Sequence, residues 1–133
     1  MLVPPLFRTL SKSKLIAFKQ CPKRLWRKFR RPKLKDDSGS EVAFRIGHEV
    51  GELAQKVFGP NNAGTVIDVN KIVWGKVYRE SARLLELGEG PIFEAALKID
   101  GAMAFADIML PDRSSGELQW QMIEVKSSTG VKD

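Results

Sequence analysis

The chain has 133 residues, enough for one domain with a hydrophobic core, and 43% of them are apolar, an ordinary share for a globular protein. Its net charge is +6 at pH 7, and no apolar run reaches the roughly 20 residues of a membrane-spanning helix. Cys21 is the single cysteine, which excludes an internal disulfide framework and favours a reducing, cytoplasmic location. We expect one domain over 1–133.

The positive charge is concentrated near the N-terminus. Of the 22 Lys and Arg residues, 12 lie within 1–35, a segment that contains no Asp or Glu. Such a block favours an anionic partner, and nucleic acid is the partner we expect. The alternative is a solvated arm that only improves solubility. The residues expected to contact nucleic acid are Lys12, Lys14, Lys23, Arg24, Arg27, Lys28, Arg30 and Arg31.

The N-terminal half reads as helices. After an extended lead-in over 1–9, Ser11 or Ser13 can cap a first helix, and Pro22 starts a second over 22–30. We expect Trp26 and Phe29 of this second helix to be core contacts. A loop over 32–40 separates this basic helical segment from the rest of the chain.

A long helix is predicted over 41–58. Its apolar stripe is formed by Val42, Ile46, Val50, Leu53, Ala54 and Val57. The helix also contains Gly47-His48-Glu49-Val50-Gly51. Because glycine lowers helix stability, the two glycines indicate close packing or the close approach of a ligand.

A turn over 59–64, a short strand over 65–69 and a helix over 71–87 closed by Gly88 come next. After this helix the apolar residues recur with a period of two. Strands over 92–99, 102–110 and 118–126 follow, the first two joined by Asp100-Gly101 as a hairpin turn. The fold class is therefore α+β, with the N-terminal helices packed on a three-stranded antiparallel meander.

Three charges interrupt these strands. Asp107 lies in a middle strand that is apolar on both faces, so we expect this strand to be central and covered on both sides. A carboxylate buried there costs free energy unless it has a partner. Glu124 and Lys126 share one side of the last strand with Trp120 and Met122, which should be the buried face. An ordinary Glu–Lys ion pair is one interpretation. The other is a carboxylate pair, Asp107 with Glu124, that holds Mg²⁺ or Mn²⁺ beside a catalytic lysine.

Asp107 followed by Glu124-x-Lys126 resembles the core of the PD-(D/E)xK nuclease superfamily. Gly47-His48 and Phe93-Glu94-Ala95 are similar to the RecB-like branch, which includes CRISPR-associated RecB-type exonucleases. Leu10-Ser11-Lys12-Ser13 and Cys21-Pro22 are also similar to that branch. The resemblance spans about residues 10–130. It implies a restriction-endonuclease-like fold, a catalytic core over 41–126 and metal-dependent hydrolysis of DNA, single-stranded or at duplex ends.

The resemblance also implies roles for individual residues. His48, Asp107 and Glu124 would ligate the metal, with the Val125 carbonyl as a further oxygen, and Asp107, Glu124 and Lys126 would be catalytic. Glu94 would bind a second metal ion or brace the site. The imidazole of His48 favours Mn²⁺ over Mg²⁺.

The chain departs from the family in two ways. Family members continue into a helix carrying Gln and Tyr after the E-x-K strand, whereas this chain ends at Asp133. We therefore expect a domain that is incomplete at its C-terminus and that a partner chain or an oligomer could complete. Some relatives bind an iron–sulfur cluster through four cysteines, which Cys21 alone cannot do, so we expect Cys21 to be a small buried residue. The alternative function is a non-catalytic nucleic-acid-binding module or an inactive nuclease fragment.

Overall fold

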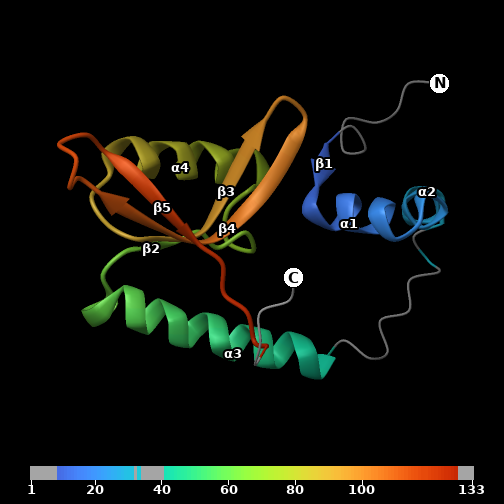
Figure 1. Ribbon diagram of the computed structural model, residues 1–133, viewed down its shortest axis with the longest axis horizontal. Helices are drawn as coiled ribbons and strands as arrows, with labels where there is room; N and C mark the ends of the chain where they lie inside the picture. The colour runs from blue at the N-terminus through green and yellow to red at the C-terminus, as the bar shows by residue number, and fades with distance from the viewer. Residues whose placement is uncertain (1–8, 32, 34–40, 129–133) are drawn as a thin grey trace. The chain divides into compact units, whose positions relative to one another are not determined.

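The computed structural model describes residues 9–31, 33 and 41–128, which fall into two compact units (Figure 1). One unit takes in Met1–Gly39 and Lys98–Ala104, and the other takes in Ser40–Leu97 and Phe105–Asp133. The lead-in and the 32–40 loop expected from the sequence lie almost entirely outside the described residues. A single domain over 1–133 stays a prediction.

The first unit contains strand β1 (Leu10–Ser11) and helices α1 (Lys12–Gln20) and α2 (Pro22–Arg30). The hydroxyl of Ser11 accepts a hydrogen bond from the main-chain N–H of Lys14 at 3.4 Å, which confirms the predicted cap. Helix α2 begins at Pro22, as predicted. Strand β1 pairs in parallel with the start of the hairpin's second strand, Leu10 opposite Ala102, a pairing too short to be visible in the sequence.

Two burial predictions in this unit are wrong. Trp26 is 53% exposed, and Cys21, at the junction of α1 and α2, is also exposed. Phe29 is half-buried, and the ammonium group of Lys14 lies 4.9 Å from the centre of its ring. The physical reason is size, because two nine-residue helices that pack together cannot enclose an indole.

The strands β2 (Thr65–Val66), β3 (Ile92–Ile99), β4 (Ala102–Asp112) and β5 (Gln119–Ile123) follow in the chain. Strands β3 and β4 form the predicted hairpin, and β4 pairs antiparallel with β5, with Ile108 opposite Ile123. The meander and the α+β class are confirmed. The sheet is mixed, since β2 pairs in parallel with β3.

The last strand is shorter than predicted. It ends at Ile123 instead of residue 126, so Glu124 and Lys126 follow it. The middle strand is central, but the prediction that both its faces are covered is wrong. Ala106, Ile108 and Met109 are buried, whereas Phe105 is 36% exposed.

Two long helices belong to the second unit. Helix α3 (Glu41–Phe58) has the predicted bounds and is followed by a short 3-10 turn, η3 (Pro60–Asn62). Helix α4 (Trp74–Leu87) begins three residues later than predicted, because Asp68 holds a turn before it. In this turn the side chain of Asp68 accepts a hydrogen bond from the N–H of Asn70 at 2.9 Å. No helix in the described residues is long and apolar enough to cross a membrane.

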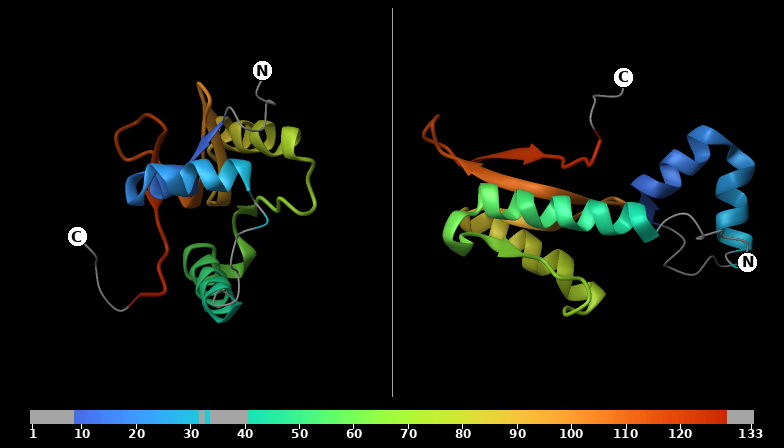
Figure 2. Two further views of the ribbon diagram at one scale, coloured as in Figure 1. Left: turned by 90° about the vertical axis from the view of Figure 1, so that its right-hand side faces the viewer. Right: turned by 90° about the horizontal axis from the view of Figure 1, so that it is seen from below.

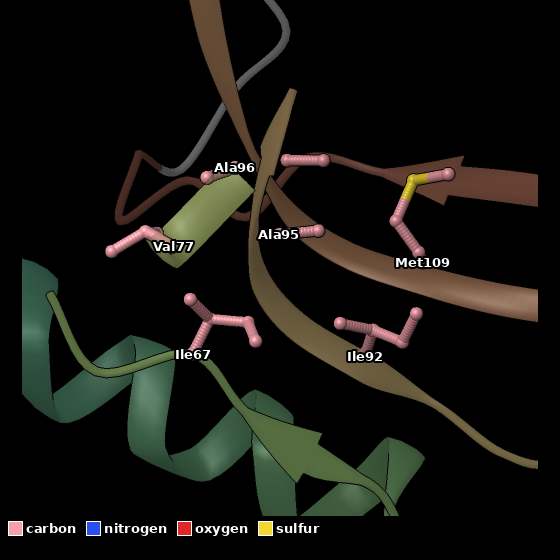
Figure 3. Close-up of a cluster of buried hydrophobic side chains, with 7 residues drawn as sticks. Ile67, Val77, Ile92, Ala95, Ala96 and Met109 are labelled. Carbon is pink, nitrogen blue, oxygen red and sulfur yellow. The ribbon is translucent and has the colours of Figure 1, made fainter. Parts of the chain in front are cut away.

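The core of the second unit joins α4 to the strands. Side chains from α4, β3, β4 and the residue after β2 meet in it, namely Val77, Ile92, Ala95, Ala96, Ala106, Met109 and Ile67 (Figure 3). Ser81 of α4 is fully buried among them, and its hydroxyl accepts a hydrogen bond from the N–H of Ala96 at 2.9 Å. This bond satisfies a buried polar group on each element.

Helix α3 lies on a different side of the strands from α4 (Figures 1 and 2). Four residues of its apolar stripe, Val42, Ile46, Leu53 and Val57, are between 44% and 64% exposed, whereas Val50 and Ala54 are half-buried. Val50, Gly51 and Gln55 of the helix line a cavity together with residues of β3 and β4.

Candidate functional site

A cavity of about 160 Å³ lies between α3, the strands β3 and β4, and the segment after β5. It gathers several residues that the sequence singled out, from segments far apart in the chain. We call it the carboxylate cavity, and it is lined by Gly47, Val50, Gly51, Gln55, Glu94, Asp107, Ile108, Val125, Lys126 and Ser127.

Glu94 brings an unusual backbone to this cavity. Its φ of 58° is left-handed although it lies inside β3. For a residue other than glycine this conformation costs roughly 1–2 kcal/mol. It also breaks the alternation of the strand, because Ala95 and Ala96 are successive residues and both are buried. Backbone strain of this kind occurs most often at functional sites.

The Glu94 carboxyl is half-buried in the cavity wall. Burial raises its pKa above the ordinary value of 4.5, the negative charge of Asp107 raises it further, and His48 lowers it. The negative charge of Asp107 therefore disfavours the ionised form of Glu94.

Asp107 is anchored from the neighbouring segment. Its Oδ2 accepts a hydrogen bond from the main-chain N–H of Val125 at 2.7 Å. This bond fixes the E-x-K segment against β4 beyond the end of β5, so Val125 and Lys126 reach the cavity wall.

Glu124 and Lys126 form an ion pair. The Lys126 Nζ lies 2.6 Å from Glu124 Oε1, and their side chains are 63% and 50% exposed. The prediction that they share the buried face is wrong, since β5 ends before them and Met122, on the same side, is 66% exposed. Lys126 lines the carboxylate cavity, whereas Glu124 is not among its described lining residues.

His48 is exposed to solvent on α3. Its imidazole is 80% exposed, and Nε2 lies 3.3 Å from a carboxylate oxygen of Glu52, one helical turn further along α3. Within residues 9–31, 33 and 41–128, no three His, Cys, Asp or Glu side chains converge as a metal-binding group. The ligand set of His48, Asp107 and Glu124 stays a prediction.

The carboxylate cavity nevertheless has the chemistry for a divalent cation. Glu94 and Asp107 supply hard oxygen ligands, which suit Mg²⁺ and Mn²⁺. A cation between the two carboxylates would remove the repulsion that raises the pKa of Glu94. The cavity volume corresponds to that of several water molecules at about 30 Å³ each, enough for ions with part of their hydration shells.

The sequence did not single out Gln55. It lies one turn beyond Gly51 and two turns beyond Gly47, so all three residues share one face of α3. That helical spacing was the signal that could have identified it. Its side-chain amide adds a neutral oxygen donor and a hydrogen-bond donor to the cavity wall.

The expected nucleic-acid-binding residues of the first unit differ in their surroundings. Lys23, Arg27 and Arg30 are exposed and recur every three or four residues along α2, so they form one basic stripe. Others have partners within the unit. Arg24 donates to the side chain of Gln20, and Lys14 and Lys28 donate to main-chain carbonyls at 2.6 and 3.4 Å.

Comparison of the chain with protein-family models, curated proteins and solved structures gives no match.

Proposed function

We propose that the chain is a metal-dependent nuclease domain of the RecB-like type, with a restriction-endonuclease-like core, that hydrolyses phosphodiester bonds in DNA at the carboxylate cavity. The observation that carries the proposal is the meeting of the carboxyl groups of Glu94 and Asp107 with Lys126 in one small cavity. A cytoplasmic location accompanies the proposal, because Cys21 is a free thiol.

Each residue has a defined task in this proposal. Glu94 and Asp107 hold Mg²⁺ or Mn²⁺, with the Val125 carbonyl, His48 and Glu124 as the further proposed ligands. Such an ion supplies positive charge at the scissile phosphate and a more acidic bound water. The ammonium group of Lys126 orients the attacking water or stabilises the charge that develops on the phosphate. The Asp107–Val125 hydrogen bond holds the segment that carries Lys126 against β4.

The test is cleavage of single-stranded and duplex DNA by the full chain with Mn²⁺ or Mg²⁺. Asp107→Ala and Lys126→Ala should each lower the rate by about 100-fold or more, the usual loss for a group that stabilises a transition state. Glu86→Ala and Lys76→Ala are matched controls, because both residues are exposed on α4 and neither lines the carboxylate cavity. Cleavage that persists in both cavity variants would contradict the proposal.

The second candidate function is nucleic-acid binding without catalysis. The ion pair between Lys126 and Glu124 favours it, because a lysine neutralised by its neighbour has less charge to offer a phosphate. The basic stripe on α2 would then be the binding surface. This function requires salt-sensitive DNA binding that EDTA does not change, with no cleavage. Binding that is indifferent to salt would count against it.

A further inference from the structure

The carboxylate cavity is too small for a nucleotide. Pockets for small organic ligands usually have volumes of about 300–1,000 Å³, whereas this one holds about 160 Å³. It suits ions, water and a phosphate group. A nuclease that acts here must place the attached nucleoside elsewhere on its surface.

A second cavity, of about 400 Å³, adjoins the first. We call it the loop cavity, and it is lined by Glu52, Gln55, Lys56, Gly59, Asn62, Ala63, Gly64, Val66 and Phe93. Gln55 lines both cavities, and α3 runs along both. Phe93 lines the loop cavity and the next residue, Glu94, lines the carboxylate cavity. Successive residues of a regular strand face opposite ways, so the left-handed φ of Glu94 is what allows the two cavities to lie side by side.

The wall of the loop cavity is tightly built. A Cβ at Gly59 would lie 2.2 Å from the carbonyl oxygen of Ala63, and one at Gly64 would lie 2.6 Å from that of Pro91. Either added atom would also lie within 3.0 Å of the Phe93 ring. The two glycines therefore let the 59–64 loop close over the ring, which is only 2% exposed.

The groups around this wall suit a nucleoside. Thr65 and Ile67 donate their N–H groups to the carbonyls of Pro91 and Phe93. Because β2 is the edge strand of the described sheet, the N–H and C=O of Val66 point away from β3, where they can pair with a base edge. The half-exposed side chain of Val66 offers an apolar surface for the base. Asn62 adds an amide, and Lys56 adds a positive charge for a phosphate. Glu52, the one acid among the described residues of the wall, lies beside His48 and can also accept from a sugar hydroxyl or a base amino group.

We propose that the loop cavity binds the nucleoside next to the scissile phosphate, as a subsite of the proposed nuclease. The ligand class is a single-stranded nucleotide unit, its base against Val66 and Asn62 and its phosphate between Lys56 and the carboxylate cavity. This inference rests on the proposed function for its role in cleavage, but binding of a nucleotide can be tested without catalysis.

The probe is a set of deoxynucleoside 5′-monophosphates titrated into the ¹⁵N-labelled full chain without metal, with amide shifts as the readout. The Gly59, Gly64 and Val66 amides should shift in a saturable way. Asn62→Gly should weaken binding by about fivefold, as expected for the loss of one net hydrogen bond. Asn61→Gly is a matched control, since Asn61 and Asn62 have φ values of 58° and 60° and Asn61 does not line the cavity. Glycine suits both backbones, so neither variant strains the fold.

Two further variants strengthen the test. Ala63→Trp should fill the loop cavity and abolish the shifts, and Lys56→Gln should weaken binding by about fivefold through the loss of a charged contact. The spectrum of each variant without ligand shows whether it is folded. Glu86→Ala should bind the monophosphates as the unaltered chain does, because Glu86 is exposed on α4 and lines neither cavity.

The outcomes separate this inference from the nuclease proposal. Shifts at the three amides in a chain that does not cleave DNA would support a nucleotide site and contradict the nuclease. Cleavage of DNA without such shifts would overturn the subsite alone. Equal weakening by Asn61→Gly and Asn62→Gly would also overturn it.

Discussion

The main-chain N–H of Val125 donates a hydrogen bond to Oδ2 of Asp107, at a distance of 2.7 Å. The bond joins β4 to the segment that follows β5 and carries Lys126 to the carboxylate cavity. Asp107 therefore has a structural task that is separable from any binding of a cation.

Substitutions at Asp107 should separate these two tasks. Asp107→Asn keeps an oxygen acceptor for the Val125 N–H and should lose little stability, whereas Asp107→Ala should lose about 1.5–3 kcal/mol, the range for a hydrogen bond to a charged group. Both should lose Mn²⁺ binding. Urea unfolding and calorimetric titration with Mn²⁺ measure the two effects. Equal stability of the two variants would show that the hydrogen bond contributes nothing.

Because the backbone of Glu94 is left-handed, we expect glycine to be more stable than alanine at this position, the reverse of the usual order in a strand. At a φ of 58°, Glu94→Gly should be more stable than Glu94→Ala by about 1 kcal/mol, because glycine adopts this conformation without strain. Met122, exposed on β5, is the control position. There the glycine variant should be the less stable one, by roughly 0.5–1 kcal/mol. Thermal unfolding of the four variants is the measurement, and the same order at both positions would contradict the prediction.

The raised pKa of Glu94 predicts a dependence of stability on pH. A carboxyl whose pKa is raised on folding is favoured in its protonated form, so its contribution is fully present below about pH 4.5 and is lost as the pH rises through the raised pKa. Glu94→Gln cannot ionise. In metal-free buffer its stability relative to the unaltered chain should therefore increase with pH across that window. A difference that is constant from pH 4 to pH 8, measured by urea unfolding at about one-unit steps, would contradict the raised pKa.

The buried hydrogen bond of Ser81 leads us to expect a large loss of stability when its hydroxyl is removed. Ser81→Ala would leave the N–H of Ala96 without its acceptor in the core, which should cost about 1–3 kcal/mol. Ser115→Ala, in the exposed turn between β4 and β5, should change stability by no more than about 0.5 kcal/mol. Equilibrium unfolding in urea compares the two variants, and equal losses would show that the buried hydrogen bond is not special.

The basic stripe of α2 predicts a salt effect. If Lys23, Arg27 and Arg30 each contact a phosphate, replacing any one of them by Gln should lower the slope of log affinity against log salt by about 0.7–0.9. The loss should be nearly independent of DNA sequence. Arg79→Gln, at an exposed position of α4, is the control and should leave the slope unchanged. Fluorescence anisotropy at several salt concentrations gives the slopes.

The features that the sequence predicted correctly have local signals. The Ser11 cap, the start of α2 at Pro22, the bounds of α3 and the hairpin at Asp100-Gly101 each depend on a few neighbouring residues. The features that were missed depend on distant parts of the chain. The parallel pairings of β1 and β2 and the end of β5 before Glu124 are set by partner strands that no local pattern reveals.

The candidate site shows the same division. Asp107, Glu94 and Lys126 meet in one cavity, a meeting that the order of the motifs indicated. The orientation of His48 could not be predicted in the same way. Neighbouring residues on a helix point about 100° apart, so Gly47 can line the cavity while His48 faces solvent beside Glu52. The resemblance indicates which residues belong together, but not which way a helix is rotated.

Gly47 and Gly51 lie one turn apart on α3, and a Cβ at either position would meet nothing within 4 Å. Alanine would therefore fit at both, and each replacement would stabilise the helix by about 1 kcal/mol. The helix forgoes that stability and leaves bare peptide backbone in the wall of the cavity. Gly→Ala at either position would place a methyl group in the open space beside that wall.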